Sequence, residues 1–152
     1  MQTILDLSSA DRDALARFYL SLDPASRRRR FRGSLTDDAV KRWCRGLDSA
    51  HCIIVVGISQ DLIEAVVELH ALTSSWRIAE LSYCSLTTDE CVRCRRSLLR
   101  LGTELAFDEG CRLLTFDLDE IMRPLVPELE LLGSAVLGES EAQLILHDRR
   151  RA

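Results

Sequence analysis

The sequence lacks the features that mark membrane and nucleic-acid-binding proteins. No apolar run approaches the ~20 residues that a membrane helix needs, and residues 1–7 contain no basic stretch followed by an apolar one. The 20 basic residues are outnumbered by 24 acidic ones, giving a net charge of −4, so there is no basic excess to attract phosphates. We therefore expect no membrane partner, no nucleic-acid partner and a cytoplasmic location.

Metal and redox motifs are scarce. The three histidines are isolated, and Cys91 and Cys94 form a Cys-x-x-Cys pair that has no second pair or nearby histidine pair to complete a four-ligand zinc site. We expect no metal. The six cysteines occur in a chain with no export signal, so reduced thiols are expected. Zinc binding or thiol chemistry at Cys91 and Cys94, where neighbouring arginines could lower a thiol pKa, remains an alternative.

The apolar content is sufficient for one core. The chain has 152 residues, of which 47% are hydrophobic and 29% charged, the length and balance of a single globular domain. We place that domain at residues 1–148. The last four residues, 149–152, contain three consecutive arginines and are expected to form a disordered basic tail.

Hydrophobic periodicity predicts alternating helices and strands. Ser8 and Asp11 resemble a capping box for a helix over residues 9–21, Pro24 ends that helix, and Gly110 ends a long one that starts at Thr88. The predicted order is β-α-α-β-β-β-α-β-α-β-β, an α/β fold with a central mixed, largely antiparallel sheet flanked by helices. The last predicted helix spans residues 119–132, and the predicted strands are 2–7, 52–56, 62–72, 77–86, 111–117, 135–137 and 142–147.

Three segments resemble a bacterial branch of the GNAT acetyltransferase superfamily. Residues 22–31 (Leu-Asp-Pro-Ala-Ser-Arg-Arg-Arg-Arg-Phe) are similar to the segment after the first helix in that branch. Residues 79–83 (Ala-Glu-Leu-Ser-Tyr) are similar to the strand before its coenzyme loop, and residues 122–125 with Leu132 and Gly133 are similar to its C-terminal motifs. The resemblance spans nearly the whole chain and implies transfer of an acyl group from acetyl-CoA to a primary amine.

The resemblance also implies where coenzyme A would bind. The pantetheine would follow the backbone of residues 82–86, and the pyrophosphate would meet the start of the long helix. Asp119 stands where the family has an asparagine. The candidate coenzyme-binding residues are Ser82, Cys84, Leu86, Arg93, Arg95, Arg96 and Asp119.

The coenzyme loop departs from the family pattern. The family has a Gln/Arg-x-x-Gly-x-Gly/Ala loop there, whereas this sequence has Arg93 and Arg95 at the two glycine positions and Leu129 where the family often has a tyrosine general acid. This departure supports an alternative, a catalytically inactive GNAT-like regulatory or interaction domain that has lost coenzyme A binding.

The candidate catalytic residues come from a hairpin. A turn at residues 73–76 would place Glu68 opposite Glu80, with His70 beside them. Two adjacent carboxylates would raise one pKa toward the value that suits a general base. An ordinary solvated strand face explains these residues equally well, because register slips easily.

The arginine run at residues 27–30, with Arg32, has two interpretations. It could bind an anionic ligand or an acidic partner, but a solvent-facing charged surface is the favoured interpretation. The acceptor amine is not defined by the sequence, and a homodimer is left open.

Overall fold

The computed structural model describes residues 2–86 and 89–148, with side chains described from residue 94 onward in the second segment. The predicted capping pair of Thr87 with Glu90 and the arginine tail at 149–151 lie outside the described residues. The element order confirms the predicted α/β architecture and adds a helix: β1 (Gln2–Ile4), α1 (Ser9–Ser21), α2 (Pro24–Phe31), α3 (Asp37–Arg45), β2 (Cys52–Ser59), β3 (Leu62–Ala71), β4 (Ile78–Ser85), α4 (Asp89–Asp108), β5 (Leu113–Asp117), η1 (Arg123–Leu125), α5 (Val126–Leu129), β6 (Gly133–Leu137) and β7 (Glu141–Leu146).

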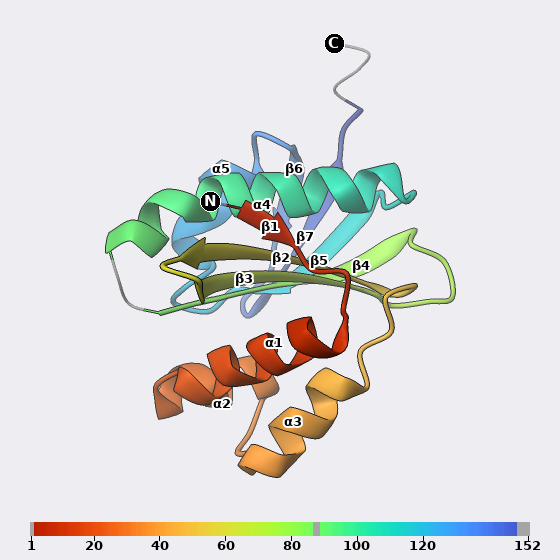
Figure 1. The fold of residues 1–152 in the computed structure, drawn as a ribbon. Helices are drawn as coiled ribbons and strands as arrows, with labels where there is room; N and C mark the ends of the chain where they lie inside the picture. The colour runs from red at the N-terminus through yellow and green to blue at the C-terminus, as the bar shows by residue number, and fades with distance from the viewer. Residues whose placement is uncertain (1, 87–88, 149–152) are drawn as a thin grey trace.

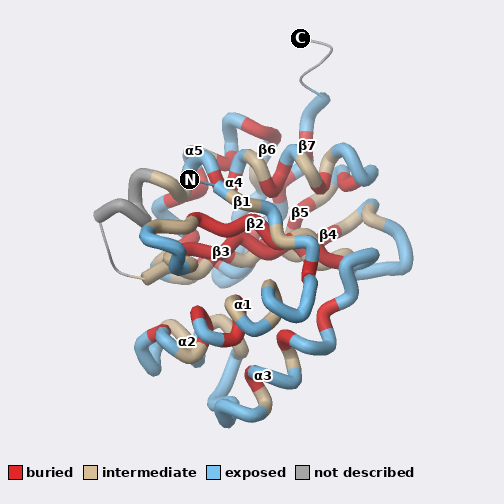
Figure 2. The backbone as a smooth tube through the Cα atoms, viewed as in Figure 1, coloured by how far each residue is buried: buried red, intermediate tan, exposed pale blue. Residues whose placement is uncertain are grey.

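Helices cover both faces of a seven-stranded sheet (Figure 1). Its strand order is β1-β2-β3-β4-β5-β7-β6, and every neighbouring pair is antiparallel except β4 with β5. Helix α4 packs on one face through Leu98, Leu99 and Ala106, and α1 with α3 packs on the other through residues that include Leu15 and Val40. Figure 2 shows the buried central strands between these layers.

Local signals explain where the helices begin and end. Ser8 and Asp11 form the predicted capping box of α1, because each side chain accepts from the other's backbone amide. Beyond the end of α4, Gly110 adopts φ +110, which side-chain-bearing residues rarely reach. Gly102 lets α4 approach the sheet, since a Cβ there would lie 2.9 Å from Leu69 Cδ1.

The sequence prediction missed one helix and made another too long. The arginine run is helical: it forms α2, which Asp23 caps by accepting from the Ser26 amide at 2.9 Å, with Pro24 in the first turn. The predicted helix over residues 119–132 is reduced to η1 and the four-residue α5. Pro124 and Pro127 remove amide donors there, so a continuous helix would lose hydrogen bonds.

Candidate active site

Strands β4 and β5 pair only over their N-terminal residues and separate toward their C-terminal ends. They pair in parallel at Ile78 with Leu113, Ala79 with Leu114 and Glu80 with Thr115. Strand β4 continues to Ser85 and β5 to Asp117 without further pairing between them. The structure thus contains a split in the middle of the sheet.

The alternation of a β-strand decides which backbone groups of β4 face this split. The amide of Leu86, the residue after β4, donates to the backbone carbonyl oxygen of Glu64 in β3 at 2.9 Å. Because consecutive residues of a strand direct their backbone groups to opposite sides, Ser82 and Cys84 also direct theirs toward β3. The backbone groups of Leu81 and Ser85 therefore face the split. The sequence analysis predicted that Ser82, Cys84 and Leu86 contact the coenzyme, but their backbone groups face β3. Ser82 and Cys84 line the pocket with their side chains.

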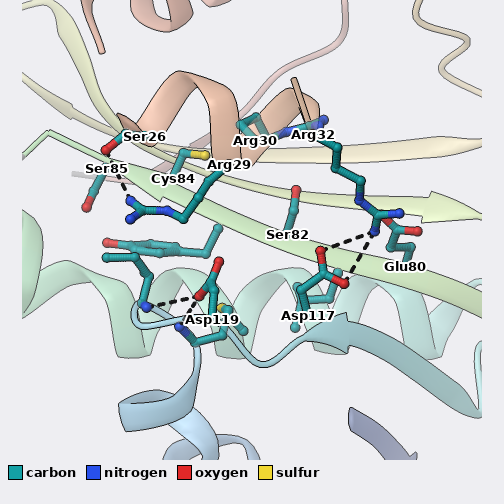
Figure 3. A pocket seen from close by; sticks show the side chains of 14 residues that line it. Ser26, Arg29, Arg30, Arg32, Glu80, Ser82, Cys84, Ser85, Asp117 and Asp119 are labelled. Carbon is teal, nitrogen blue, oxygen red and sulfur yellow. Dashed lines mark hydrogen bonds and ion pairs between the residues drawn. The ribbon is translucent and has the colours of Figure 1, made fainter. Parts of the chain in front are cut away.

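A pocket occupies the split (Figure 3). Its walls come from β4, from the end of β5 and the segment after it, and from α2 with the residue that follows it, Arg32. Its polar lining includes Arg29, Arg32, Glu80, Ser82, Asp117 and Asp119. The pocket therefore brings together two of the predicted site carboxylates, Glu80 and Asp119, with arginines of the run.

Arg32 crosses the mouth of the split between β4 and β5. One of its terminal nitrogens lies 3.3 Å from Glu80 Oε1 and 3.2 Å from Asp117 Oδ2, as Figure 3 shows. The side chain is 63% exposed. Exposed ion pairs of this length are weak and readily exchanged. The ion pairs of Arg32 with Glu80 and Asp117 therefore hold this side chain across the pocket mouth only weakly.

Glu68 lies behind this pocket in a buried cluster. Its side chain is 1% exposed and accepts from the Tyr19 hydroxyl, from Arg30 Nε at 2.5 Å, and at 3.1 Å from His70 Nε2 in the tautomer that carries a proton there. The three partners come from α1, α2 and the same strand, β3. The cluster thus joins two helices to the centre of the sheet.

The charge state of Glu68 follows from these contacts. Burial opposes ionisation, but the Arg30 charge and the His70 hydrogen bond outweigh it and lower the pKa of Glu68 to about 2. The same burial, reinforced by the negative charge of Glu68, raises the pKa of Tyr19 well above its usual value. Glu68 is therefore a fixed anion, and it is not a carboxylate whose pKa is raised toward that of a general base.

The predicted hairpin register is also wrong by two residues. Glu68 pairs with Ser82, and Glu80 pairs with His70. A shift of two preserves the face on which each side chain lies, so Glu68, His70 and Glu80 share one face as predicted. Glu68 and Glu80 are nevertheless not directly opposite, and Arg30 intervenes as the counter-charge of Glu68.

Arg30 contradicts the interpretation of the arginine run as a wholly solvated surface. Its side chain is 13% exposed, and its guanidinium carbon lies 4.7 Å from the centre of the Trp43 ring and 5.1 Å from that of Phe31. Burial opposes the charge of Arg30, but Glu68 outweighs this and raises the pKa above the usual value. Arg28 and Arg32 are exposed, as predicted.

At the start of α4, positions 93 and 95 are both helical. The side chain of Arg93 lies outside the described residues. Arg96 forms an ion pair with Glu128 of α5 at 2.6 Å. Asp119 accepts from the amides of Ile121 and Met122, at 2.9 and 2.7 Å, and so stabilises the turn after β5. Both side chains therefore have partners within the chain.

The buried cysteines are poor nucleophiles. Burial raises the pKa of Cys84 and of Cys44 to about 12 and that of Cys52 to about 11, so their thiols stay protonated near neutral pH. Cys94 is a free thiol, and the side chain of Cys91 lies outside the described residues. Within the described part of the chain, no group of three or more His, Cys, Asp or Glu side chains could hold a metal ion.

The fold is that of known acetyltransferases. An aminoglycoside 6'-acetyltransferase of type Ii superposes with a TM-score of 0.72 at 12% identity, covering 98% of this chain and 99% of that one. The GNAT domain of an S. lividans protein gives 0.70 at 14%, covering 94% and 89%. A putative acetyltransferase from Salmonella typhimurium, solved with its cofactor acetyl-CoA, gives 0.65 at 13%, covering 98% and 96%.

The sequence matches no family model and no curated protein. The structural likeness nevertheless defines the architecture: the chain has the fold of the GNAT acetyltransferase superfamily. Among residues 2–86 and 89–148, the helices are too short or too polar to cross a membrane.

Proposed function

We propose that the protein is a GNAT-type N-acyltransferase that moves an acetyl or other acyl group from coenzyme A to a primary amine. The observation that carries this proposal is the separation of β4 from β5. It leaves an extended strand edge above a pocket, and such an edge can hydrogen-bond the amide groups of an extended ligand, as a further strand would. The pantetheine arm is a chain of that kind.

The residues around the split fit coenzyme A in this orientation. The backbone groups of Leu81 and Ser85 would bind the pantetheine, and Ser82 and Cys84 would line its course. The thioester would supply the activated acyl group. The start of α4 would face the pyrophosphate, where Arg95 and Arg96 could donate to phosphate oxygens from planar guanidinium groups.

Glu80 is the proposed general base. It lines the pocket, is 40% exposed and lies beside the split, so an amine could reach it. The amine nitrogen would bond to the acyl carbon, the carbon–sulfur bond would break, and Glu80 would take the amine proton for return to the thiolate of coenzyme A.

Glu68 and His70 are proposed to hold other groups of the site in place without contacting the substrate. Glu68 is enclosed by Tyr19, Arg30 and His70, so a substrate amine cannot displace these groups without disrupting the core. Instead, Glu68 anchors α2, which carries Arg29 and Arg32 to the pocket. His70 lies opposite Glu80 across the β3–β4 ladder and limits where that side chain can lie.

A thermal-shift titration with acetyl-CoA tests the proposal. Ligand at about ten times its dissociation constant stabilises by about 1.4 kcal/mol, which raises the melting temperature by roughly 3–6 °C for a chain of this size. Ser82→Phe should abolish the shift by filling the pocket, whereas Ser49→Phe, at an exposed turn residue, should retain it. The absence of any shift at millimolar acetyl-CoA would refute coenzyme binding.

The inactive GNAT-like domain remains a second candidate because α4 already includes positions 93 and 95. A helix with arginines there presents bulky side chains where glycines would expose bare amides. If these arginines obstruct the pyrophosphate, Arg93→Gly with Arg95→Gly should tighten acetyl-CoA binding despite a cost of about 1 kcal/mol per glycine in helix stability. Weaker binding, measured by isothermal titration, would instead make the arginines the phosphate-binding groups, and unchanged binding would refute the obstruction.

A further inference from the structure

A second pocket lies at the opposite end of α4 from the proposed pyrophosphate position. The last turns of α4, residues 103–108, form one wall, and Leu132 with residues 146–148 at the end of β7 forms the other. Its volume is about 310 Å³, enough for a small ligand. The two pockets share no lining residue. The second pocket is therefore separate from the site proposed for acyl transfer.

The floor of the second pocket is apolar except for one hydroxyl group. Leu132 and Leu146 are buried there, and Phe107 packs against the same core. Thr103 is 2% exposed, and its hydroxyl oxygen has no hydrogen-bond partner among the described residues. A threonine inside a helix can donate to the carbonyl oxygen four residues earlier, but Thr103 does not.

The Thr103 hydroxyl points to a ligand. A buried hydroxyl without a partner has lost its hydrogen bonds to water and gained none in return, which destabilises the protein. A ligand that hydrogen-bonds this group would recover the loss. The cavity and the unsatisfied hydroxyl are independent observations, and Thr103 belongs to both.

The rim of the second pocket has a different chemistry from its floor. Glu104, Asp108 and Asp148 bring carboxylates to the rim, and no lysine or arginine of the described chain lines the pocket. Glu104 pairs with Arg100 at 3.3 Å, but both side chains are exposed, so this ion pair is weak. Arg112 lies against the Phe107 ring without lining the pocket. The rim therefore favours a positively charged group.

We propose that the second pocket binds a small organic cation that carries a hydrogen-bonding group at the end opposite its ammonium group. The ammonium group would lie at the rim against Glu104. The apolar middle of the ligand would lie over Leu132 and Leu146, and the far polar group would meet Thr103. An anion would be repelled at the rim, and a purely apolar ligand would leave Thr103 unsatisfied. This site goes beyond the proposed function, since its ligand would touch neither Glu80 nor the split.

A titration with tyramine, followed by amide NMR, tests where such a ligand binds. Tyramine has a phenolic hydroxyl and an ammonium group at opposite ends of an apolar ring. The shifted amides should centre on residues 103–108 and 146–148. Ser82→Phe, which fills the pocket at the split, should leave the dissociation constant unchanged. Shifts centred on β4 and β5, or loss of binding in Ser82→Phe, would overturn the proposal.

A comparison of two ligands with two proteins tests the contact with Thr103. Thr103→Val keeps the shape of the side chain and removes the hydroxyl, so tyramine should bind about fivefold to tenfold more weakly. Phenethylamine lacks the phenolic hydroxyl and should bind wild type and Thr103→Val equally. Equal affinities of wild type and Thr103→Val for tyramine would overturn the proposal.

Two further measurements test the rim and the state of the empty pocket. Glu104→Gln should weaken tyramine binding about threefold, whereas Glu109→Gln, at an exposed residue outside the pocket, should not change it. The anion p-hydroxyphenylacetate should bind much more weakly than tyramine, and equal binding would contradict the proposal. Without ligand, Thr103→Val should be at least as stable in urea as wild type, because an unsatisfied hydroxyl is lost. Clear destabilisation would show that the hydroxyl already has a partner and would also overturn the proposal.

Discussion

The substitution Glu68→Gln tests the buried cluster that anchors α2. Glutamine is close in shape to glutamate but carries no charge, so the Arg30 guanidinium would remain buried without its counter-ion. The Tyr19 hydroxyl and His70 would keep a neutral acceptor. We therefore expect a folded protein with a much lower free energy of unfolding.

The magnitude follows from the pKa of Glu68. Its usual value of 4.5 falls to about 2 in the folded protein, and each unit corresponds to 1.36 kcal/mol. Ionised Glu68 thus contributes about 3 kcal/mol, similar to the ~3–5 kcal/mol lost when one member of a buried ion pair is removed. Because the folded pKa is the lower one, this contribution is complete above about pH 5 and disappears as the pH falls toward 2.

Urea unfolding followed by tryptophan fluorescence can measure this loss, since Trp43 lies against Arg30. The difference in unfolding free energy between wild type and Glu68→Gln should be about 3 kcal/mol at pH 7 and should shrink steadily below pH 4.5. Glu109→Gln, at an exposed residue, should differ from wild type by less than about 0.5 kcal/mol. A Glu68→Gln difference that does not change with pH would refute the charge-pair reasoning.

Two other substitutions test the packing on either side of the sheet. Gly102→Ala should lower the free energy of unfolding in urea by about 1–3 kcal/mol, because the new methyl group meets Leu69. The control Gly33→Ala places its methyl group in open space and should be nearly neutral. Equal effects of the two substitutions would contradict the close approach of α4 to the sheet. Arg30→Lys keeps the positive charge but loses the guanidinium contact with the Trp43 ring. It should lower the free energy of unfolding by about 1–2 kcal/mol. An unchanged free energy of unfolding would show that the contact does not stabilise the protein.

The parts of the fold that could be predicted are those set by local chemistry. The Ser8–Asp11 capping box defines the start of α1, and Pro24 predicts its end. Gly110 marks the end of α4 in the same way. The last predicted helix is wrong because Pro124 and Pro127 remove amide donors that a continuous helix over residues 119–132 would need.

The site depends on long-range register, which local chemistry leaves open. The sequence could place Glu68, His70 and Glu80 on one face, because that needs only the alternation of a strand. It could not place Ser82 opposite Glu68, since the turn between β3 and β4 decides that pairing. Nor could it show where β4 and β5 separate, because they are joined only through the long helix α4.

The buried arginine could have been found from its own segment. Asp23 followed by Pro24 is typical of a helix start as well as of a stop, and Asp23 caps α2 in the structure. In a helix that begins there, positions 27, 30 and 31 fall on one face. Arg27 and Arg30 have side chains only 18% and 13% exposed. Four consecutive arginines therefore do not form a uniformly solvated surface, because helical geometry turns Arg30 toward the buried carboxylate of Glu68, which neutralises it.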